Sequence, residues 1–147
     1  MTVAGNLPQV GVGVVLFRDK NVLLVQRSRP PRAGEWSIPG GRQQLGETVI
    51  AAARRELFEE TGLSPAGRLV LVDVVDSIDR AANGAIVSHY TLIDFTAHAA
   101  AGEARPGGDS VAVCWAALRD LPSFRLWSRT QEVIAEAARR LGVLAQR

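Results

Sequence analysis

Three glutamates near the middle of the chain, Glu56, Glu59 and Glu60, have a spacing that could bring their carboxylates together. Residues 47–61 contain no glycine or proline and are rich in Ala, Arg, Glu and Leu, so they predict a helix. On a helix of 3.6 residues per turn, the three glutamates fall within an arc of about 100°. Clustered carboxylate oxygens are hard ligands that suit Mg²⁺ or Mn²⁺, ions that keep several waters and bridge to substrate phosphates.

An acidic helix face has two interpretations. In one, the carboxylates are solvated and balanced by Arg54 and Arg55, as on most charged helix faces. In the other, they bind a divalent cation beside a cleft. The Gly40-Gly41 turn directly upstream favours the cation site, because glycine lets the backbone approach a ligand closely and can direct a carbonyl oxygen at a metal. A solvated helix face has no need of such a turn.

The glycine turn and the helix are parts of one longer pattern. Residues 41–63 have the sequence GRQQLGETVIAAARRELFEETGL, in which fixed spacings separate Gly41, Glu47, Arg55-Glu56-Leu57, Glu59-Glu60 and Gly62-Leu63. This pattern resembles the signature of the Nudix hydrolase family at every fixed position. Residues 36–41, WSIPGG, are similar to the usual approach to that signature. The resemblance extends over residues 10–141.

The resemblance implies a hydrolase that cleaves the pyrophosphate of a nucleoside diphosphate linked to another group. It assigns Glu56, Glu59 and Glu60 as metal ligands, with the Gly41 carbonyl as a further one, for Mg²⁺ or alternatively Mn²⁺. Such an ion neutralises phosphate charge and activates the attacking water. In this family the general base is a signature glutamate in some members and an acid of a later loop in others. We favour Glu56 as the base, with Glu59 and Asp109 as open alternatives.

Charged residues around the signature have expected roles of their own. The resemblance implies that Glu47 pairs with Arg55 and stiffens the helix, which requires the segment before the helix to fold back. Arg27 ends the second expected strand, where its guanidinium could bind a phosphate bidentately. Arg29 and Arg32 lie in the loop that approaches the signature, and we expect them to be solvated.

The signature leaves the substrate open. One group of ADP-ribose pyrophosphatases carries a proline sixteen residues after the signature, where this chain has Asp79. Residues 89–95, HYTLIDF, followed by a glycine-rich loop, nevertheless resemble small bacterial ADP-ribose pyrophosphatase-like members, so we expect an ADP-ribose-like substrate. The alternatives are pyrophosphatase activity on dNTPs or oxidised nucleotides, and a module that senses a nucleotide without cleaving it. An intact signature argues against the sensing module.

The remaining elements frame the acidic helix. Five segments rich in β-branched residues predict strands: residues 10–17, 21–26, 69–75, 86–96 and 111–117. The first two predict a hairpin, and residues 79–84 predict a loop. Ser128, with Gln131 three residues later, predicts the N-cap and capping box of a second helix that ends at Gly142. This order predicts an α+β fold, and the resemblance implies an α/β/α sandwich with a mixed sheet and the signature's loop–helix–loop.

Length and composition exclude several classes of protein. The 147 residues, 47% of them hydrophobic, predict one domain over residues 1–147. The 17 basic and 15 acidic residues argue against a nucleic-acid partner bound by a basic surface. No apolar run approaches the roughly 18 residues of a membrane span, so we expect a cytoplasmic protein. The resemblance implies a small nucleotide as its ligand. Cys114 lies in an apolar run and is expected to be buried, and the resemblance suggests a homodimer.

Overall fold

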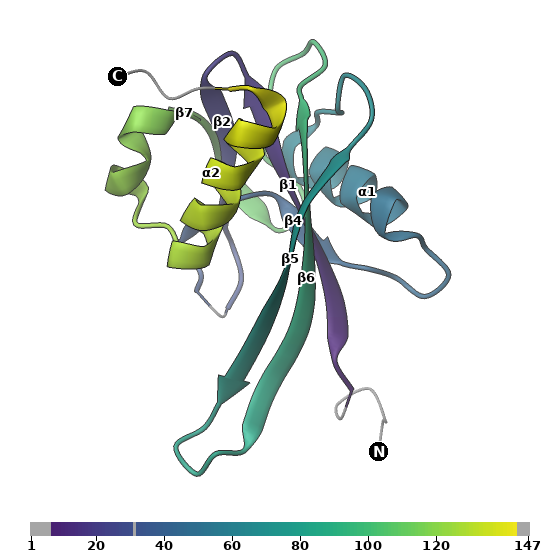
Figure 1. The fold of residues 1–147 in the computed structure, drawn as a ribbon, viewed down its shortest axis with the longest axis vertical. Helices are drawn as coiled ribbons and strands as arrows, with labels where there is room; N and C mark the ends of the chain where they lie inside the picture. Colours follow the sequence, from purple (N-terminus) through teal and green to yellow (C-terminus); the bar gives the residue numbers. More distant parts are fainter. Residues whose placement is uncertain (1–6, 31, 144–147) are drawn as a thin grey trace.

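The structure is a computed structural model that describes residues 7–30 and 32–143. A mixed β-sheet runs through the centre of the molecule (Figure 1). Its strands lie in the order β3 (Trp36–Ser37), β2 (Asn21–Arg27), β1 (Gln9–Arg18), β6 (Ile86–His98) and β5 (Val70–Arg80). Two further strands branch from this path: β4 (Gly40–Arg42) pairs with β1, and β7 (Ser110–Ala117) pairs with β2.

Strand β1 organises the sheet because it borders three other strands. It runs parallel to β6 from Gln9, opposite Tyr90, to Phe17, opposite His98. It is antiparallel to β2 at the hairpin and antiparallel to β4 where Gly13 lies opposite Gly40. Its β-branched and aromatic side chains alternate between the two faces and are buried on both, which gives the sheet two hydrophobic cores.

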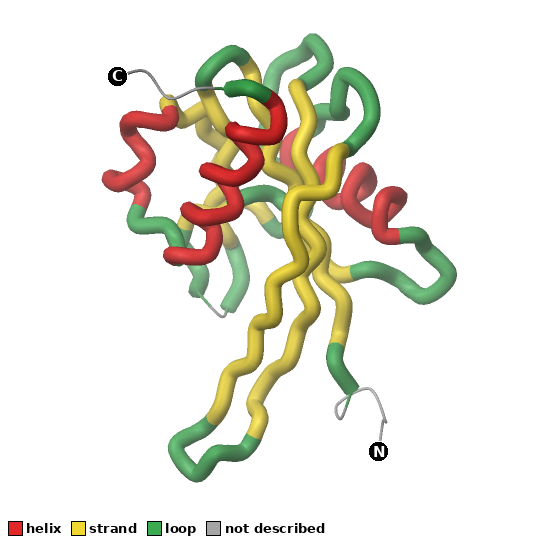
Figure 2. The backbone as a smooth tube through the Cα atoms, viewed as in Figure 1, coloured by secondary structure: helices red, strands yellow, loops and turns green. Residues whose placement is uncertain are grey.

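The two helices cover opposite faces of the sheet (Figures 1 and 2). Helix α1 (Val49–Thr61) packs on the core that contains Val14, and helix α2 (Ser128–Leu141) packs on the core that contains Val15. A 3-10 helix, η2 (Leu118–Phe124), leads from β7 towards α2. In the part of the chain that the structure describes, no helix is long and apolar enough to cross a membrane.

Strands β5 and β6 extend as a long hairpin beyond the body of the molecule (Figure 2). Near the body, Val72 and Val75 of β5 are buried in the core under α2. Towards the tip, the side chains of Ile86 and Val87 are exposed. The part of the hairpin that packs under α2 also forms one wall of a large cavity.

Most of the expected elements are confirmed, with shifted ends. The hairpin of β1 and β2 and the mixed sheet between helices are present. Helix α1 begins at Val49 rather than at Glu47, because the Oγ1 atom of Thr48 accepts a hydrogen bond from the Ala51 N–H and caps the helix. Strand β5 continues to Arg80, so the loop predicted from residue 79 begins later; pairing with β6 keeps these residues extended.

Two local predictions are wrong. Trp127, not Ser128, holds the N-cap position of α2, without a side-chain cap. The predicted capping box does not form, because Gln131 instead donates through Nε2 to the carbonyl of Leu126, a buried residue that anchors the entry to the helix. Cys114 is half-buried rather than buried, because β7 lies at an edge of the sheet and pairs with β2.

Candidate active site

The glycine turn of β4 receives two carboxylates from α1. The backbone N–H of Gly40 donates a hydrogen bond of 2.9 Å to Oε1 of Glu60. A Cβ atom at Gly41 would overlap the carboxylate of Glu56, so only glycine leaves room for that side chain. The turn predicted from the sequence to approach a ligand thus packs directly against two of the three signature glutamates.

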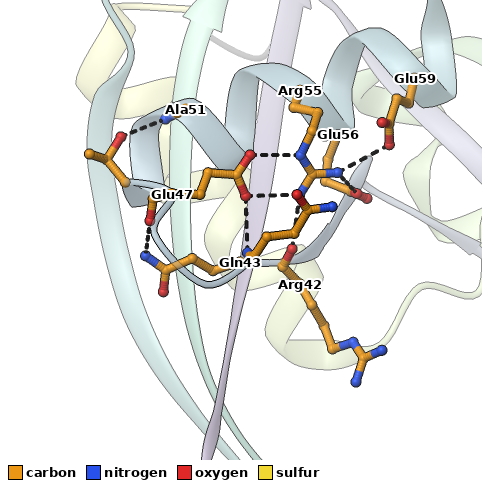
Figure 3. Close-up of polar contacts among 9 residues, drawn as sticks. Arg42, Gln43, Glu47, Ala51, Arg55, Glu56 and Glu59 are labelled. Atoms are coloured by element: carbon orange, nitrogen blue, oxygen red, sulfur yellow. Dashed lines mark hydrogen bonds and ion pairs between the residues drawn. The ribbon is translucent and has the colours of Figure 1, made fainter.

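Arg55 holds the segment before α1 against the helix (Figure 3). Its Nε and Nη2 atoms donate to the two carboxylate oxygens of Glu47 at 2.7 and 3.0 Å, and Nη2 also donates to the Arg42 carbonyl at 3.0 Å. Its Nη1 atom donates to Glu56 at 2.6 Å and to Glu59 at 3.2 Å. The hydrogen bonds from Arg55 hold the pKa of Glu47 below its usual range. The segment therefore folds back, as the Glu47–Arg55 pair requires.

Burial raises the pKa values of the two carboxylates at the glycine turn. Glu60 is 7% exposed, and desolvation raises its pKa to about 7, against the opposing effects of the Gly40 hydrogen bond and the charge of Arg27. Desolvation also raises the pKa of Glu56, although Arg55 opposes the shift. Two desolvated carboxylates favour a proton or a cation beside them, which is the property expected of a site that binds a metal ion.

The loop that leads into β7 brings further charge to the C-terminal end of α1. The Oγ atom of Ser110 donates to the Glu60 carbonyl at 2.8 Å and fixes the loop on the helix. The neighbouring Asp109 is close enough for its charge to raise the pKa of Glu60. Its carboxylate also forms a 3.0 Å ion pair with Arg29 from the opposite loop. Arg27, Asp109 and Glu60 thus lie at one end of the sheet.

A cavity of about 1140 Å³ extends from the glycine turn across the face of the sheet that α2 covers. Glu56, Glu60 and Arg27 line one end. Its apolar walls come from four elements or loops and include Ile38, Val75, Leu92 and Val133. Trp127 also lines the cavity, with the guanidinium of Arg32 5.7 Å from the centre of its ring. A charged end that continues into an apolar pocket is typical of a site for a nucleotide.

The structure brings most of the predicted site residues together. Gly41, Arg55, Glu56, Glu60 and Arg27 all line the cavity. Glu47 and Glu59 do not line it. Each of them forms an ion pair with Arg55, which does line the cavity, and half of the Glu59 side chain is exposed.

Three features were missed by sequence reasoning. Arg29 and Arg32 are exposed, as expected, and in addition they contact Asp109 and Trp127, residues distant in sequence. No sequence signal marks these pairs. The third, Asp94, lies buried in the cavity, and its only signal is an acidic residue within a predicted strand.

The donor set fits a hard divalent cation, although the ligands are not gathered in advance. Among residues 7–30 and 32–143, no three acidic, histidine or cysteine side chains already converge as a metal site. Arg55 contacts Glu56 and Glu59 from one side, while Glu60 is turned to Gly40. The room that Gly41 leaves for Glu56, and the desolvation of both cavity carboxylates, are what Mg²⁺ or Mn²⁺ would need.

Comparisons with known proteins agree with this geometry. The NUDIX domain model matches residues 7–137. A putative 8-oxo-dGTP diphosphatase 2 of Mycobacterium tuberculosis is 39% identical over 142 residues, which cover 92% of each chain. An ADP-ribose pyrophosphatase of Methanocaldococcus jannaschii is 35% identical over 117 residues, 80% of this chain and 66% of its own length.

A solved structure extends the similarity to the fold. The crystal structure of a MutT NUDIX hydrolase from Burkholderia pseudomallei superposes with a TM-score of 0.76 at 39% identity, covering 88% of this chain and 98% of that one. These sequence and fold similarities are independent of the cavity. They nevertheless indicate the same chemistry as its carboxylates, which is hydrolysis of a pyrophosphate. This chain belongs to the Nudix family and is a pyrophosphate hydrolase of that class.

Proposed function

We propose that the enzyme hydrolyses purine nucleoside triphosphates to the nucleoside monophosphate and pyrophosphate, with Mg²⁺ as its cofactor and Mn²⁺ as a substitute. The observation that carries this proposal is the pair of desolvated carboxylates, Glu56 and Glu60, at the glycine turn where the cavity begins. The relative aligned over 92% of both chains is named as a diphosphatase of 8-oxo-dGTP, which favours a triphosphate.

In this proposal Glu56, Glu59, Glu60 and the Gly41 carbonyl hold the metal ion. Nudix hydrolases generally use divalent metal ions. Such an ion neutralises charge on the diphosphate and makes a bound water more acidic. Water adds to one phosphorus, the bridging P–O bond breaks, and the leaving phosphate oxygen takes the electron pair of that bond.

The chain's own residues position the substrate and move the proton. Glu56 accepts the proton of the attacking water, because it lines the cavity at the glycine turn where the phosphates are bound. Arg27, at the cavity end of β2, binds a phosphate oxygen pair. Glu47 acts as a positioning residue, because its ion pair with Arg55 fixes the helix that carries Glu56.

Product analysis tests this function. We expect dGTP or 8-oxo-dGTP with Mg²⁺ to yield the monophosphate and pyrophosphate, and we expect EDTA to abolish the reaction. Nucleotide binding without any product, with Mg²⁺ and with Mn²⁺, would contradict the proposal and favour a sensing module.

A second candidate substrate is ADP-ribose. It is favoured by the relative named ADP-ribose pyrophosphatase, although that similarity covers 66% of the relative's length. Hydrolysis of ADP-ribose would give AMP and ribose 5-phosphate. A higher kcat/KM for ADP-ribose than for any dNTP in the same assay would establish this alternative.

The cellular setting and assembly of the enzyme also remain proposals. We propose a cytoplasmic homodimer whose ligand is a small nucleotide, without nucleic-acid or membrane partners. Light scattering measures the mass in solution directly, and a mass of one chain at micromolar concentration would contradict the dimer.

A further inference from the structure

One buried carboxylate in the cavity belongs to neither the glycine turn nor α1. Asp94, in the middle of β6, is 7% exposed and lines the cavity on the face that α2 covers. It lies opposite Gly13 of β1 in the parallel register. A Cβ atom at Gly13 would overlap Oδ1 of Asp94, so the absence of a side chain at Gly13 leaves the space that the carboxylate occupies.

Asp94 is also the exception among buried polar residues. In the part of the chain that the structure describes, the four others each make a side-chain hydrogen bond: Glu60 with Gly40, Thr61 with Leu57, Thr96 with Val15, and Ser110 with Glu60. Within that same part, the Asp94 carboxylate makes no side-chain hydrogen bond and no ion pair. No fully buried side-chain oxygen in the described residues lacks a hydrogen-bond partner, so the Asp94 carboxylate oxygens keep contact with the open cavity, where they can accept hydrogen bonds from a ligand.

The surroundings of Asp94 supply no positive charge. Burial raises its pKa to about 6, and the negative charge of Asp73 on the neighbouring strand adds to the shift. Two apolar side chains lie nearby: Ile38 contacts the same Gly13 site, and Leu92 precedes Asp94 on the same face of β6. Above pH 7 the group is therefore mostly an anion that can only accept hydrogen bonds.

The chemistry of the bases identifies a partner for such an acceptor. Guanine presents two adjacent donors, N1–H and the 2-amino group, whereas adenine places its 6-amino donor beside the N1 acceptor. Cytosine likewise pairs one donor with one acceptor, and thymine has one donor between two acceptors. A carboxylate that lines the cavity therefore matches the guanine edge and opposes the edges of the other bases.

We propose that Asp94 is the residue that selects guanine-type bases, including oxidised guanine, by accepting hydrogen bonds from their N1–H and 2-amino groups. This deepens the proposed function and rests on it, since the base must enter the cavity whose charged end holds the phosphates. The metal ligands and Arg27 bind parts common to all nucleotides, whereas Asp94 touches only the base.

The test measures binding without hydrolysis. Calorimetry at pH 8 in EDTA compares dGMP with dAMP for the wild type, for Asp94→Asn and for Asp94→Leu. Asp76→Asn is the matched control, because Asp76 is an exposed aspartate of β5 that does not line the cavity. Thermal unfolding of each variant is recorded alongside, because Asp94→Asn removes a buried charge without changing the shape of the side chain.

We expect the wild type to bind dGMP more tightly than dAMP. In Asp94→Asn, the ratio of the two dissociation constants should move towards adenine by about 10- to 100-fold, because a carboxamide offers one acceptor and one donor. Asp94→Leu should lose the preference, Asp76→Asn should keep it, and neither Asp94 variant should unfold at a lower temperature than the wild type.

Three results would overturn the inference. One is a dGMP-to-dAMP ratio that moves less than threefold in both Asp94 variants. Another is loss of folding in both variants, which would show that Asp94 serves packing. The third is a wild type that hydrolyses nucleotides without preferring guanine, which leaves the proposed function intact. A guanine preference in binding without any hydrolysis would do the reverse: it would support the role of Asp94 and contradict the proposed function.

Discussion

Helices α1 and α2 both carry a glutamate that is paired with arginine, and the two pairs behave in opposite ways. On α2, Glu136 pairs with Arg139 and Arg140 at the surface, and these hydrogen bonds lower its pKa. On α1, Glu56 pairs with Arg55, yet burial raises its pKa. The Glu56 side chain is 14% exposed and that of Glu136 is 31% exposed.

The difference shows that an arginine partner alone does not mark a functional glutamate. Solvent around Glu136 can replace Arg139 at little cost, because exposed ion pairs contribute little. Glu56 is held between Arg55 and the glycine turn, where less solvent reaches it and a change of its charge has larger consequences. Each change at the site is therefore matched with a change on α2 or at an exposed position.

The largest effect is expected from removing the charge of Glu56. Glu56→Gln should lower kcat by about 10²- to 10⁴-fold, the usual contribution of a general base. Its unfolding temperature should not fall, because a desolvated carboxylate becomes neutral. Glu136→Gln on α2 should keep wild-type activity. Steady-state kinetics on both variants measures this difference in kcat. Full activity in Glu56→Gln would show that Glu56 is not a catalytic residue.

The next effect concerns the fit between the glycine turn and α1. Gly41→Ala adds a methyl group where the Glu56 carboxylate lies, so the carboxylate must move. A displacement of about 1 Å can lower turnover by about 100-fold. Gly67→Ala is the control, because nothing lies within 4 Å of its added methyl group. Equal kcat values for the two variants would show that the close approach at Gly41 is not needed.

On the face of the sheet under α2, Asp94 should make stability depend on pH. Its pKa rises from 3.8 to about 6 on folding, so the folded state binds the proton more tightly. Stability should therefore fall as pH rises from about 4 to 6, by at most about 3 kcal/mol. Urea unfolding at several pH values should show this loss in the wild type and in Asp76→Asn but not in Asp94→Asn. If stability changes with pH in the same way in all three proteins, Asp94 is not the source of the pH dependence.

The smallest effect is expected from the arginine partners themselves. Arg55→Gln leaves three carboxylates without their counter-charge and should lower the free energy of unfolding by about 1–2 kcal/mol. Arg140→Gln, whose pair with Glu136 lies at the surface, should leave the urea midpoint unchanged. If the two variants lose the same stability, the contrast between the helices does not hold.

The signature, the glycine turn and the acidic helix could be predicted from the sequence, because they depend on near neighbours. The conformational freedom of glycine, the helical spacing of the glutamates and the resemblance all indicated a site at Gly41, Glu56 and Glu60. These three residues line one cavity. The pair of Glu47 and Arg55, implied by the resemblance, is also present in the structure. Local rules failed at the start of α2, where the burial of Leu126 placed Trp127 at the N-cap.

Only the tertiary structure decided which distant residues share the cavity and which charges are buried. Asp94 and Gly13 lie 81 positions apart in the chain, yet the parallel register of β1 and β6 places them side by side. Arg29 and Asp109 meet across two loops in the same way. The physical reason is that backbone conformation depends on a few adjacent residues, whereas desolvation and pairing depend on the packing of the whole sheet between its two helices.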